Sequence, residues 1–323
     1  MKKKEKQHKT SVGGQALIEG IMMKGPRGTA MSVRLPSGEI ETEYKEAKPW
    51  RDKCKFFRIP LVRGVVGFAE SMVTGYKYLM ESAEKSTQGL EDETENMSKL
   101  DRWINEHFGE KMMNVIGGIS AVLGIGLAFF LFMWLPTYLV DLATGGNLLK
   151  FHALFEGIIR VIIFVLYMLL VSQMKDIKRV FMYHGAEHKS IFCYENGLEL
   201  TVENVRKQSR FHPRCGTSFM FVMILLSILL SSALVLIFPA LADVNRVLWI
   251  LIKLLILPLV MGIGYEFIRY AGRHDNVLVK ILAAPGLWMQ RITTKEPTDD
   301  IIEVGIASLQ AVLTDNSEDD EIK

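Results

Sequence analysis

This chain has few cysteines and a small net charge. Its 323 residues include three cysteines, Cys54, Cys193 and Cys215. An odd set of three makes a poor disulfide framework and is compatible with a reducing compartment. The 38 lysines and arginines nearly balance the 36 aspartates and glutamates, which leaves a formal net charge of +2. The composition therefore predicts no nucleic-acid partner.

Several common sequence signals are also missing. The glycine-rich stretch at 13–26 has neither G-x-G-x-x-G nor the Lys-Ser/Thr of a P-loop, which argues against a phosphate cradle. No G-x-S-x-G nucleophile elbow occurs, so a serine hydrolase fits poorly. The first lysines are not closely followed by an apolar core, and we expect no cleavable signal peptide.

Long apolar runs are what the sequence has in abundance. Hydrophobic residues make up 49% of the chain, and its mean hydropathy is +0.20. Four runs, near 114–140, 151–174, 218–242 and 246–270, are each long enough to cross a hydrocarbon core of about 30 Å. We therefore predict a mainly α membrane protein, in which a four-helix transmembrane bundle at 111–274 contacts the lipid bilayer. A small cytosolic α+β portion completes the predicted fold.

The charges between the runs predict their direction. The short connections near 141–150 and 239–246 carry few lysines or arginines. The 175–217 loop is basic, its cations being Lys175, Lys178, Arg179, Lys189, Arg206, Lys207, Arg210 and Arg214. Because cytoplasmic loops carry the excess of Lys and Arg, we expect this loop and both termini to be cytoplasmic.

The remaining segments are assigned from composition and periodicity. They are a basic flexible arm (1–10), a cytosolic β-rich segment (11–58), an amphipathic or re-entrant helix (59–81), a polar linker (82–110), a cytosolic helical segment (275–313) and an acidic disordered tail (314–323). Alternation at 31–35 and 40–44 around the turn at 36–38 predicts a β-hairpin, to which 13–24 could add a further strand. The stripe of small residues in 59–81 would let another helix approach closely, although a buried soluble helix fits equally well.

The 175–217 loop contains a candidate metal site. His184 and His188 share a helix face at i,i+4 spacing, with Glu187 beside them. This is the H-x-x-E-H spelling of inverted zincins, in which the two histidines bind metal and the glutamate activates water. His212 and Cys215 lie in the same loop. We predict a divalent metal, zinc, bound by His184, His188 and one or both of His212 and Cys215, with Glu187 as catalytic base.

Several alternatives at this site stay open. With four protein ligands the site would be closed and structural, whereas three would leave a position for water. Cys193 could substitute as a ligand, but a lone cysteine in such a place is more often a packed small hydrophobe. Glu195, Glu199, Glu203, His274, Tyr265 and Glu266 are further candidates whose ordinary surface or helix-end roles are favoured.

These features predict a membrane-embedded metal-dependent enzyme, specifically a hydrolase acting at the cytoplasmic membrane surface. Its position alone indicates a lipid-linked or membrane-protein substrate. The alternative is a non-enzymatic membrane scaffold or assembly partner with a structural His/Cys site. A transporter is a weaker third option, because Asp141, Glu156 and Arg160 are among the few ionisable groups in the predicted spans.

A set of motifs spread over about residues 11–313 resembles a known family. They are Gly13–Gly20 with Met22-Met23, His184–Lys189, Leu200–Val205, His212–Phe219, Tyr265-Glu266 with Gly272, and Ala284–Trp288 with Glu296-Pro297. The chain resembles the YqhQ-like bacterial multi-pass membrane proteins of uncharacterised function, sometimes labelled predicted metal-dependent enzymes. The resemblance implies a location in a bacterial cell membrane. The likeness to inverted zincin peptidases covers only five residues, so their fold and substrates do not carry over.

Overall fold

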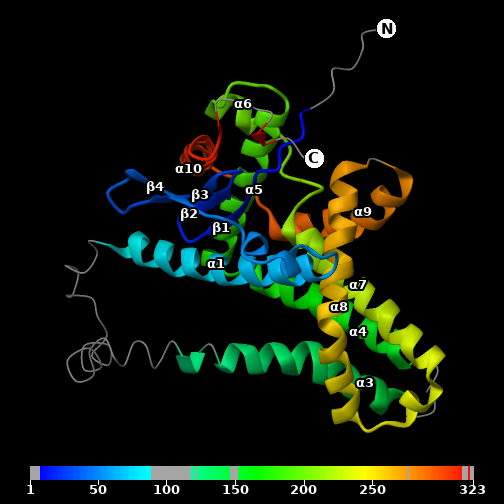
Figure 1. Cartoon of the computed structure of the whole chain (residues 1–323). Helices are drawn as coiled ribbons and strands as arrows, with labels where there is room; N and C mark the ends of the chain where they lie inside the picture. Colours follow the sequence, from blue (N-terminus) through cyan, green and yellow to red (C-terminus); the bar gives the residue numbers. More distant parts are fainter. Residues whose placement is uncertain are drawn as a thin grey trace, which may run out of the picture. The chain divides into compact units, whose positions relative to one another are not determined.

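The computed structural model describes residues 8–88, 118–120, 122–145, 152–274, 276–314 and 319–320 (Figure 1). The chain divides into two compact units. The first, which we call the sheet unit, comprises Met1–Gln88, Tyr167–Leu226 and Ile256–Lys323. The second, the bundle unit, comprises Gly89–Leu166 and Ser227–Leu255.

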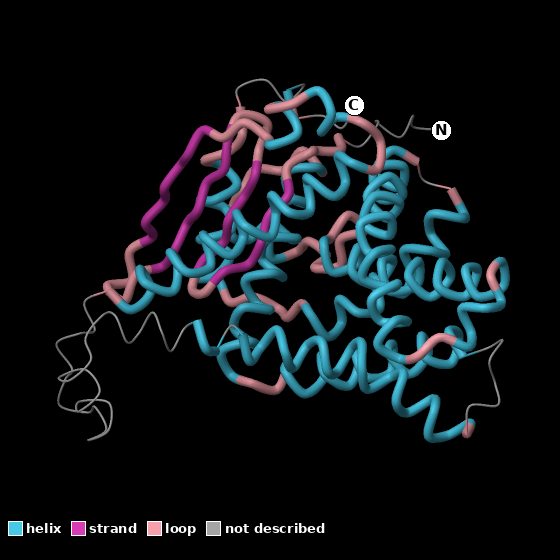
Figure 2. Tube along the Cα trace, turned by 60° about the horizontal axis from the view of Figure 1, so that its bottom comes forward, coloured by secondary structure: helices cyan, strands magenta, loops and turns pink. Residues whose placement is uncertain are grey.

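A four-stranded antiparallel sheet forms the centre of the sheet unit (Figure 2). Its strands are β1 (Gly13–Leu17), β2 (Gly20–Lys24), β3 (Gly28–Arg34) and β4 (Ile40–Glu46), and they pair in chain order. The pairing of β3 with β4 confirms the predicted hairpin. The 13–24 run contains two strands instead of one, because Glu19, with φ of 52°, turns the chain back between β1 and β2.

Helices cover both faces of this sheet, and the period-two alternation of the strands decides which side chains meet each layer. Ile21, Met23 and Ala30 pack in one core with α5 (Lys175–Glu195) and α10 (Asp299–Gln310). Met22 and Met31 point the opposite way and pack with α1 (Val62–Thr87). The sheet unit is therefore layered α/β/α, with α5 and α10 on one side and α1 on the other.

Helix α1 extends the predicted helix at 59–81 toward its C-terminal end. It begins at Val62 and ends at Thr87, so the first part of the predicted 82–110 linker is helical. Residues 89–110 of that linker lie outside the described residues. The small residues of α1 allow another helix to approach closely, as predicted. A Cβ on Gly64 would lie 2.7 Å from the Cβ of Tyr265 in α8 (Arg246–Arg273).

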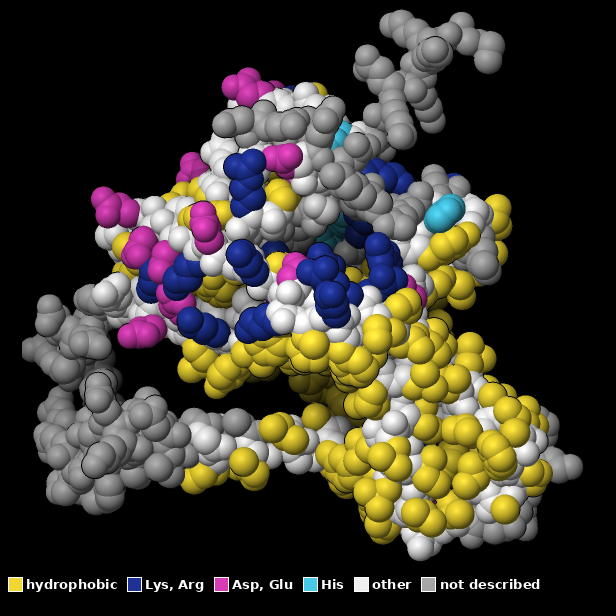
Figure 3. Space-filling view, in the orientation of Figure 1, with side chains coloured by type: hydrophobic (Ala, Val, Ile, Leu, Met, Phe, Trp, Pro, Cys, Tyr) yellow, Lys and Arg dark blue, Asp and Glu magenta, His cyan; other side chains and the backbone are white. Residues whose placement is uncertain are grey.

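Four helices of the described chain are long and apolar enough to cross a membrane: Gly118–Thr144, His152–Val171, Met220–Ile237 and Val247–Ala271. They include the π-helical turn η4 (Phe130–Trp134), α3 (Leu135–Thr144), α4 (His152–Val171), most of α7 (Gly216–Ile237) and most of α8. Hydrophobic side chains cover much of their visible surface (Figure 3). A mainly helical protein with four such helices and a small sheet is thus confirmed.

The bundle unit buries a charged cluster around Glu156 of α4, which is 1% exposed. Its Oε1 accepts a hydrogen bond from Nη2 of Arg160 at 2.6 Å and forms an ion pair with Lys253 of α8. Its Oε2 accepts from Nε1 of Trp249 at 3.2 Å. The i,i+4 pair of Glu156 and Arg160 is visible in the sequence, but Lys253 is not, because it lies 97 residues away.

We expect Glu156→Gln to lower the free energy of unfolding by about 3 kcal/mol or more, because Arg160 and Lys253 would lose their shared anion in a buried site. Thermal or denaturant unfolding of the detergent-solubilised protein measures the change. Glu199→Gln, at an exposed position outside this cluster, controls for the loss of one carboxylate. Equal stability of the two variants would contradict the expectation.

The ends of the chain are more ordered than the sequence predicts. Thr10, in the predicted flexible arm, is buried, and its Oγ1 donates a hydrogen bond to Oδ2 of Asp320 at 2.7 Å. Asp320 belongs to the predicted disordered tail, yet it is 1% exposed and its carbonyl also accepts from the N–H of Ser11. The predicted flexible arm and disordered tail are therefore corrected at residues 8–10 and 319–320, because these two segments form hydrogen bonds with each other. Residues 1–7, 315–318 and 321–323 lie outside the described residues.

The predicted helical segment at 275–313 contains α9 (Val277–Thr293) and α10. The side chain of Asn276 caps α9 by accepting a hydrogen bond from the N–H of Val279. Acidic Asp299 and Asp300 occupy the first turn of α10, where they complement the helix dipole. Ile301, Val304 and Leu309 then follow the helical period and enter the core beneath the sheet.

Candidate metal centre

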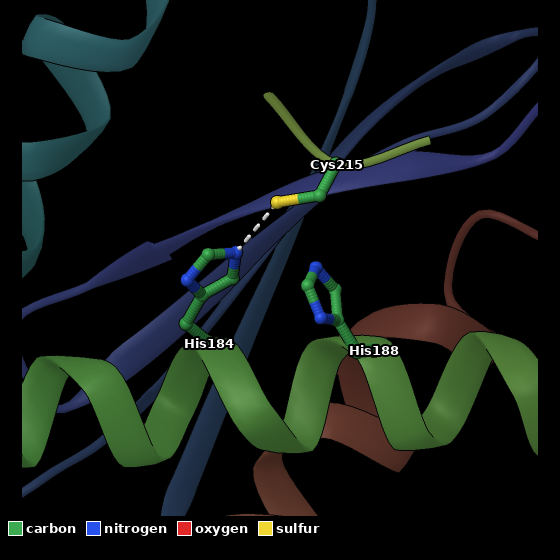
Figure 4. A group of neighbouring side chains, drawn as sticks. All are labelled: His184, His188 and Cys215. Atoms are coloured by element: carbon green, nitrogen blue, oxygen red, sulfur yellow. Dashed lines mark hydrogen bonds between the residues drawn. The ribbon is translucent and has the colours of Figure 1, made fainter. Parts of the chain in front are cut away.

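Helix α5 holds the first half of the site. The 175–217 segment is predicted to be a loop, and the structure corrects this, because Lys175–Glu195 is helical and Val202–Arg206 forms the short helix α6. Tyr183 and Ala186 enter the core shared with the sheet and α10, which fixes the rotation of α5 about its axis. His184 and His188 consequently project from the same side of the helix (Figure 4).

The second half of the site lies just before α7. Gln290 of α9 holds this segment by its backbone, since the N–H of His212 donates to Oε1 of Gln290 at 2.7 Å and the carbonyl of His212 accepts from Nε2 at 2.7 Å. Both residues are buried. Cys215 follows three residues later, one residue before α7 begins, and is 7% exposed.

Three side chains from these two segments converge. One ligand atom each from His184, His188 and Cys215 lies within 4.8 Å of the other two. Nε2 of His184 lies 3.1 Å from Sγ of Cys215, and Figure 4 shows both imidazoles rising from α5 toward the sulfur. The prediction that the two separated segments meet at one point therefore matches the geometry of these three residues.

Backbone carbonyls orient both imidazoles. Nδ1 of His184 lies 2.8 Å from the carbonyl of Thr293, and Nδ1 of His188 lies 2.6 Å from the carbonyl of Arg210. A carbonyl oxygen only accepts, so we assign a proton to Nδ1 of each ring, which makes Nε2 the nitrogen available to a metal. Each Nε2 is then left with a lone pair. Histidines that ligate metals in proteins nearly always have this arrangement.

The buried Nε2 of His188 has no hydrogen-bond partner among the residues that the structure describes. Leaving such an acceptor unsatisfied away from water is costly. A divalent cation would satisfy it, because neutral imidazole nitrogens and a thiolate are the ligands that zinc prefers. The three residues therefore fit a zinc-type ion.

His212, the fourth predicted ligand, lies beside this group. Its ring centroid is 5.5 Å from that of His188, but its Nδ1 accepts from the N–H of Arg214 at 3.3 Å. Its Nε2 is 3.7 Å from Oε2 of Glu195, beyond hydrogen-bond distance, so this buried nitrogen also has no hydrogen-bond partner among the described residues. Burial lowers the pKa of His212 to about 4, although the Glu195 carboxylate opposes the shift. The ring is therefore neutral at physiological pH and packs against His188.

Glu187 connects the site to the first strand. It is buried, and its Oε1 accepts a hydrogen bond from the N–H of Gly14 in β1 at 3.0 Å. Burial raises the pKa of this carboxyl, and the nearby His184 and the Gly14 N–H oppose the shift. The contact between Glu187 and Gly14 spans 173 residues and could not be found from either motif alone.

The close approach of β1 requires glycine at position 14. A Cβ there would lie 2.7 Å from the carbonyl oxygen of Met22 and 3.0 Å from the carboxyl carbon of Glu187. A Cβ on the neighbouring Gly13 would meet no atom of the described residues within 4 Å. The second glycine of the N-terminal motif is thus explained by its close approach to Met22 of β2 and Glu187 of α5.

We expect Gly14→Ala to destabilise the protein by about 1 to 3 kcal/mol, because the added methyl group overpacks the contacts of β1 with Met22 and Met23 of β2 and with Glu187 of α5. Gly13→Ala is the matched control, with a change near zero. Denaturant unfolding of both variants measures the difference. If both variants were destabilised to the same extent, the close contacts of position 14 would not explain why it is a glycine.

The remaining sequence candidates have other partners. Cys193 is fully buried against Val205 and Ile302. Burial would raise the pKa of Glu195, but His212, Arg214 and the N–H of Thr10 lower it. Three others make hydrogen bonds or ion pairs elsewhere, Glu203 with Lys207, Glu266 with Arg63, and His274 with the carbonyl of Tyr270. Within the described residues, the three-membered group is the only such His/Cys/carboxylate cluster.

Comparison with known proteins identifies relatives but no activity. The family described as "Protein of unknown function (DUF1385)" matches residues 59–315. The "Uncharacterized protein YqhQ" of Bacillus subtilis (strain 168) is 33% identical over 312 residues, which cover 93% of this chain and 92% of that protein. No solved structure matches the chain.

Proposed function

The chain belongs to the DUF1385 family of proteins of unknown function, as its YqhQ-like motifs predict, and we propose that it is a metal-dependent membrane enzyme. The proposed reaction is hydrolysis at the cytoplasmic surface of a bacterial cell membrane. One observation carries this proposal, the convergence of His184, His188 and Cys215 within 4.8 Å. The orientation of both imidazoles by backbone carbonyls gives it further support.

The number of ligands favours a catalytic site over a structural one. Structural zinc sites have four protein ligands, whereas catalytic sites have three and keep one position open. When bound, a zinc ion at such a site supplies a Lewis acid that makes water a good nucleophile near neutral pH. His184 is the half-buried member of the group, while His188 and Cys215 are buried. A substrate would therefore approach on the His184 side.

Glu187 is the proposed general base. Its raised pKa, caused by burial, moves the carboxyl toward the operating pH, where a general base is most effective. The hydrogen bond from the N–H of Gly14 fixes the orientation of the carboxylate next to His184. Its position between the two histidines matches the order of the inverted zincin motif.

The membrane location rests on the four apolar helices and on the distribution of charge. Each helix is long and apolar enough to cross a bilayer. The basic 175–217 segment, which contains most of the site, supports a cytoplasmic location for it and for both termini. A site at that surface would meet lipid-linked substrates or membrane polypeptides.

Cobalt(II) substitution tests for an open position without knowledge of the substrate. We expect the cobalt protein to show a thiolate charge-transfer band from Cys215, which Cys215→Ser removes. We also expect added azide or a hydroxamate to shift the visible d–d bands, because an exogenous ligand can enter a three-ligand site. Cobalt bands that do not respond to either ligand would indicate a closed structural site.

A non-enzymatic scaffold is the second candidate. The hydrogen bond between Gly14 and Glu187 favours it, because this bond joins α5 to β1 and gives the carboxylate a structural role. In that case the His/Cys group would join α5 to the start of α7 and take no part in a reaction. The Glu187→Gln variant separates the two candidates.

A further inference from the structure

Four of the six charged side chains of α1, Arg63, Glu70, Glu81 and Lys85, pair with other parts of the protein, whereas Lys77 and Glu84 are exposed. Glu70 is buried and accepts hydrogen bonds from Nζ of Lys24 at 2.6 Å and from the N–H of Trp50 at 2.9 Å. Further along the helix, Glu81 pairs with Lys45 at 3.1 Å, and Lys85 pairs with Glu41 and Glu43 of β4 at 2.6 Å and 3.2 Å. A helix on the surface of a water-soluble protein would have its charges on the outside.

The outward face of α1 carries an apolar stripe, with the exposed Lys77 and Glu84 at its border on the side toward β4. Met72, Val73, Tyr76 and Met80 are 57%, 56%, 62% and 52% exposed. Met72, Tyr76 and Met80 are spaced i, i+4, i+8 and so form one stripe, with Val73 at its edge. Sheet contacts occupy the opposite side of the helix, through Tyr78. A contiguous exposed apolar surface of this kind marks an interaction site.

A basic and aromatic segment leads into this stripe. It contains the 3-10 turns η1 (Trp50–Asp52) and η2 (Lys55–Arg58). The stretch has four exposed cations, Arg51, Lys53, Lys55 and Arg58, and one acidic residue, Asp52, which pairs with Arg58 at 3.1 Å. Phe56 and Ile59 are 59% and 47% exposed. Figure 3 shows a row of Lys and Arg side chains on this face of the sheet unit, with hydrophobic side chains along α1 directly below it.

The first turn of α1 is fixed to a candidate membrane span. Nε and Nη2 of Arg63 donate to the two carboxylate oxygens of Glu266 at 2.6 Å and 2.5 Å. Glu266 lies near the C-terminal end of the apolar helix Val247–Ala271, the end proposed above to be cytoplasmic. A Cβ on Gly262 would lie 2.9 Å from Leu61, so the backbones pass very closely. Helix α1 therefore starts where this span would leave the bilayer.

We propose that the face formed by residues 50–61 and the apolar stripe of α1 docks on an anionic lipid bilayer. The stripe would lie at the boundary between headgroups and acyl chains, and the four cations would contact anionic headgroups. A second copy of the chain fits less well, because a symmetric contact would bring the cations of residues 51–58 against each other. This inference rests on the proposed membrane insertion, but not on the metal site.

Depth-dependent fluorescence quenching in nanodiscs tests the docking. Cys54 is exposed, whereas Cys193 and Cys215 are buried, so the full-length Cys54→Ser protein retains no exposed thiol in its described part. In that background, Tyr76→Cys probes the stripe and Leu255→Cys, 80% exposed in the fourth apolar helix, probes insertion. Glu203→Cys is the aqueous control, because α6 packs on α5 and α10, on the opposite side of the sheet from α1.

Each variant is labelled with a thiol-reactive fluorophore in nanodiscs containing phosphatidylglycerol, with and without a lipid nitroxide near the headgroups. We expect the nitroxide to quench the label at position 76 at least about threefold more than the label at position 203. Replacement of phosphatidylglycerol by phosphatidylcholine should reduce the quenching of a label on native Cys54 by about twofold or more.

The controls separate failure of the docking from failure of the membrane proposal. Quenching at position 255 by a mid-chain nitroxide, with position 76 quenched no more than position 203, would overturn the docking and retain the insertion. Absence of quenching at both 76 and 255 would overturn both. Protection of position 76 from lipid and aqueous quenchers alike would overturn the docking by showing that another protein surface covers the stripe. Equal quenching of the label on Cys54 in phosphatidylglycerol and phosphatidylcholine would contradict the proposed contact between the four cations and anionic headgroups.

Discussion

Cys215→Ser is expected to weaken zinc binding by at least about 100-fold, because loss of a ligand exceeds the 10- to 100-fold cost of losing a group that only orients one. Nε2 of His184 lies 3.1 Å from this sulfur, and the three ligand atoms share one small volume. Competition with a chromophoric chelator at fixed pH measures the dissociation constant. The pH must be constant, because the ligands lose protons on binding.

Cys193→Ser is the matched control for this result. Cys193 is also buried, but it packs with Val205 and Ile302 and does not belong to the three-membered group. We expect its replacement to affect stability and to leave the zinc dissociation constant unchanged. Equal affinities of the Cys215 variant and the wild type would show that the sulfur is not a ligand.

Glu187→Gln is expected to lower the biological activity by a factor of about 100 to 10,000, the usual contribution of a general base. The amide oxygen of glutamine can still accept from the N–H of Gly14, so the link between α5 and β1 remains. Metal content and stability should therefore remain close to those of the wild type. Rescue of a strain that lacks the gene measures activity, with the variant expressed at the wild-type level.

The scaffold candidate predicts a different pattern for the same variant. If the site is structural, Glu187→Gln supports rescue as the wild type does, while His184→Ala destabilises the protein. If the site is catalytic, Glu187→Gln fails to rescue although it is folded and holds metal. Full rescue by Glu187→Gln would therefore remove the enzyme proposal and leave the scaffold.

Much of this fold can be predicted from the sequence, because strands and helices each impose a short-range spacing on their residues. The alternation at 31–44 predicts the β3–β4 hairpin, and the apolar runs predict the four long helices. The i,i+4 spacing of His184 and His188 predicts their shared face. The sequence did not predict α5, because the charged residues of 175–195 are interspersed with the apolar residues that enter the core, such as Tyr183 and Ala186, and so obscure the helical period.

Contacts between distant segments could not be predicted in this way. The bond from Gly14 to Glu187, the ion pair between Glu156 and Lys253, and the burial of Asp320 all join residues that no periodicity relates. His212 shows a subtler limit. Its three-residue spacing to Cys215 is typical of paired ligands, yet its Nδ1 accepts from the N–H of Arg214, and His212 is not among the three residues whose ligand atoms lie within 4.8 Å of one another.

Elemental analysis of the purified protein tests the central claim most directly. Wild-type protein, prepared without chelators, is expected to contain about one equivalent of zinc or a similar divalent metal per chain. The His184→Ala/His188→Ala variant, purified in parallel, is expected to contain almost none. Near-zero metal in both preparations, or equal metal in both, would contradict the existence of a metal centre at these residues.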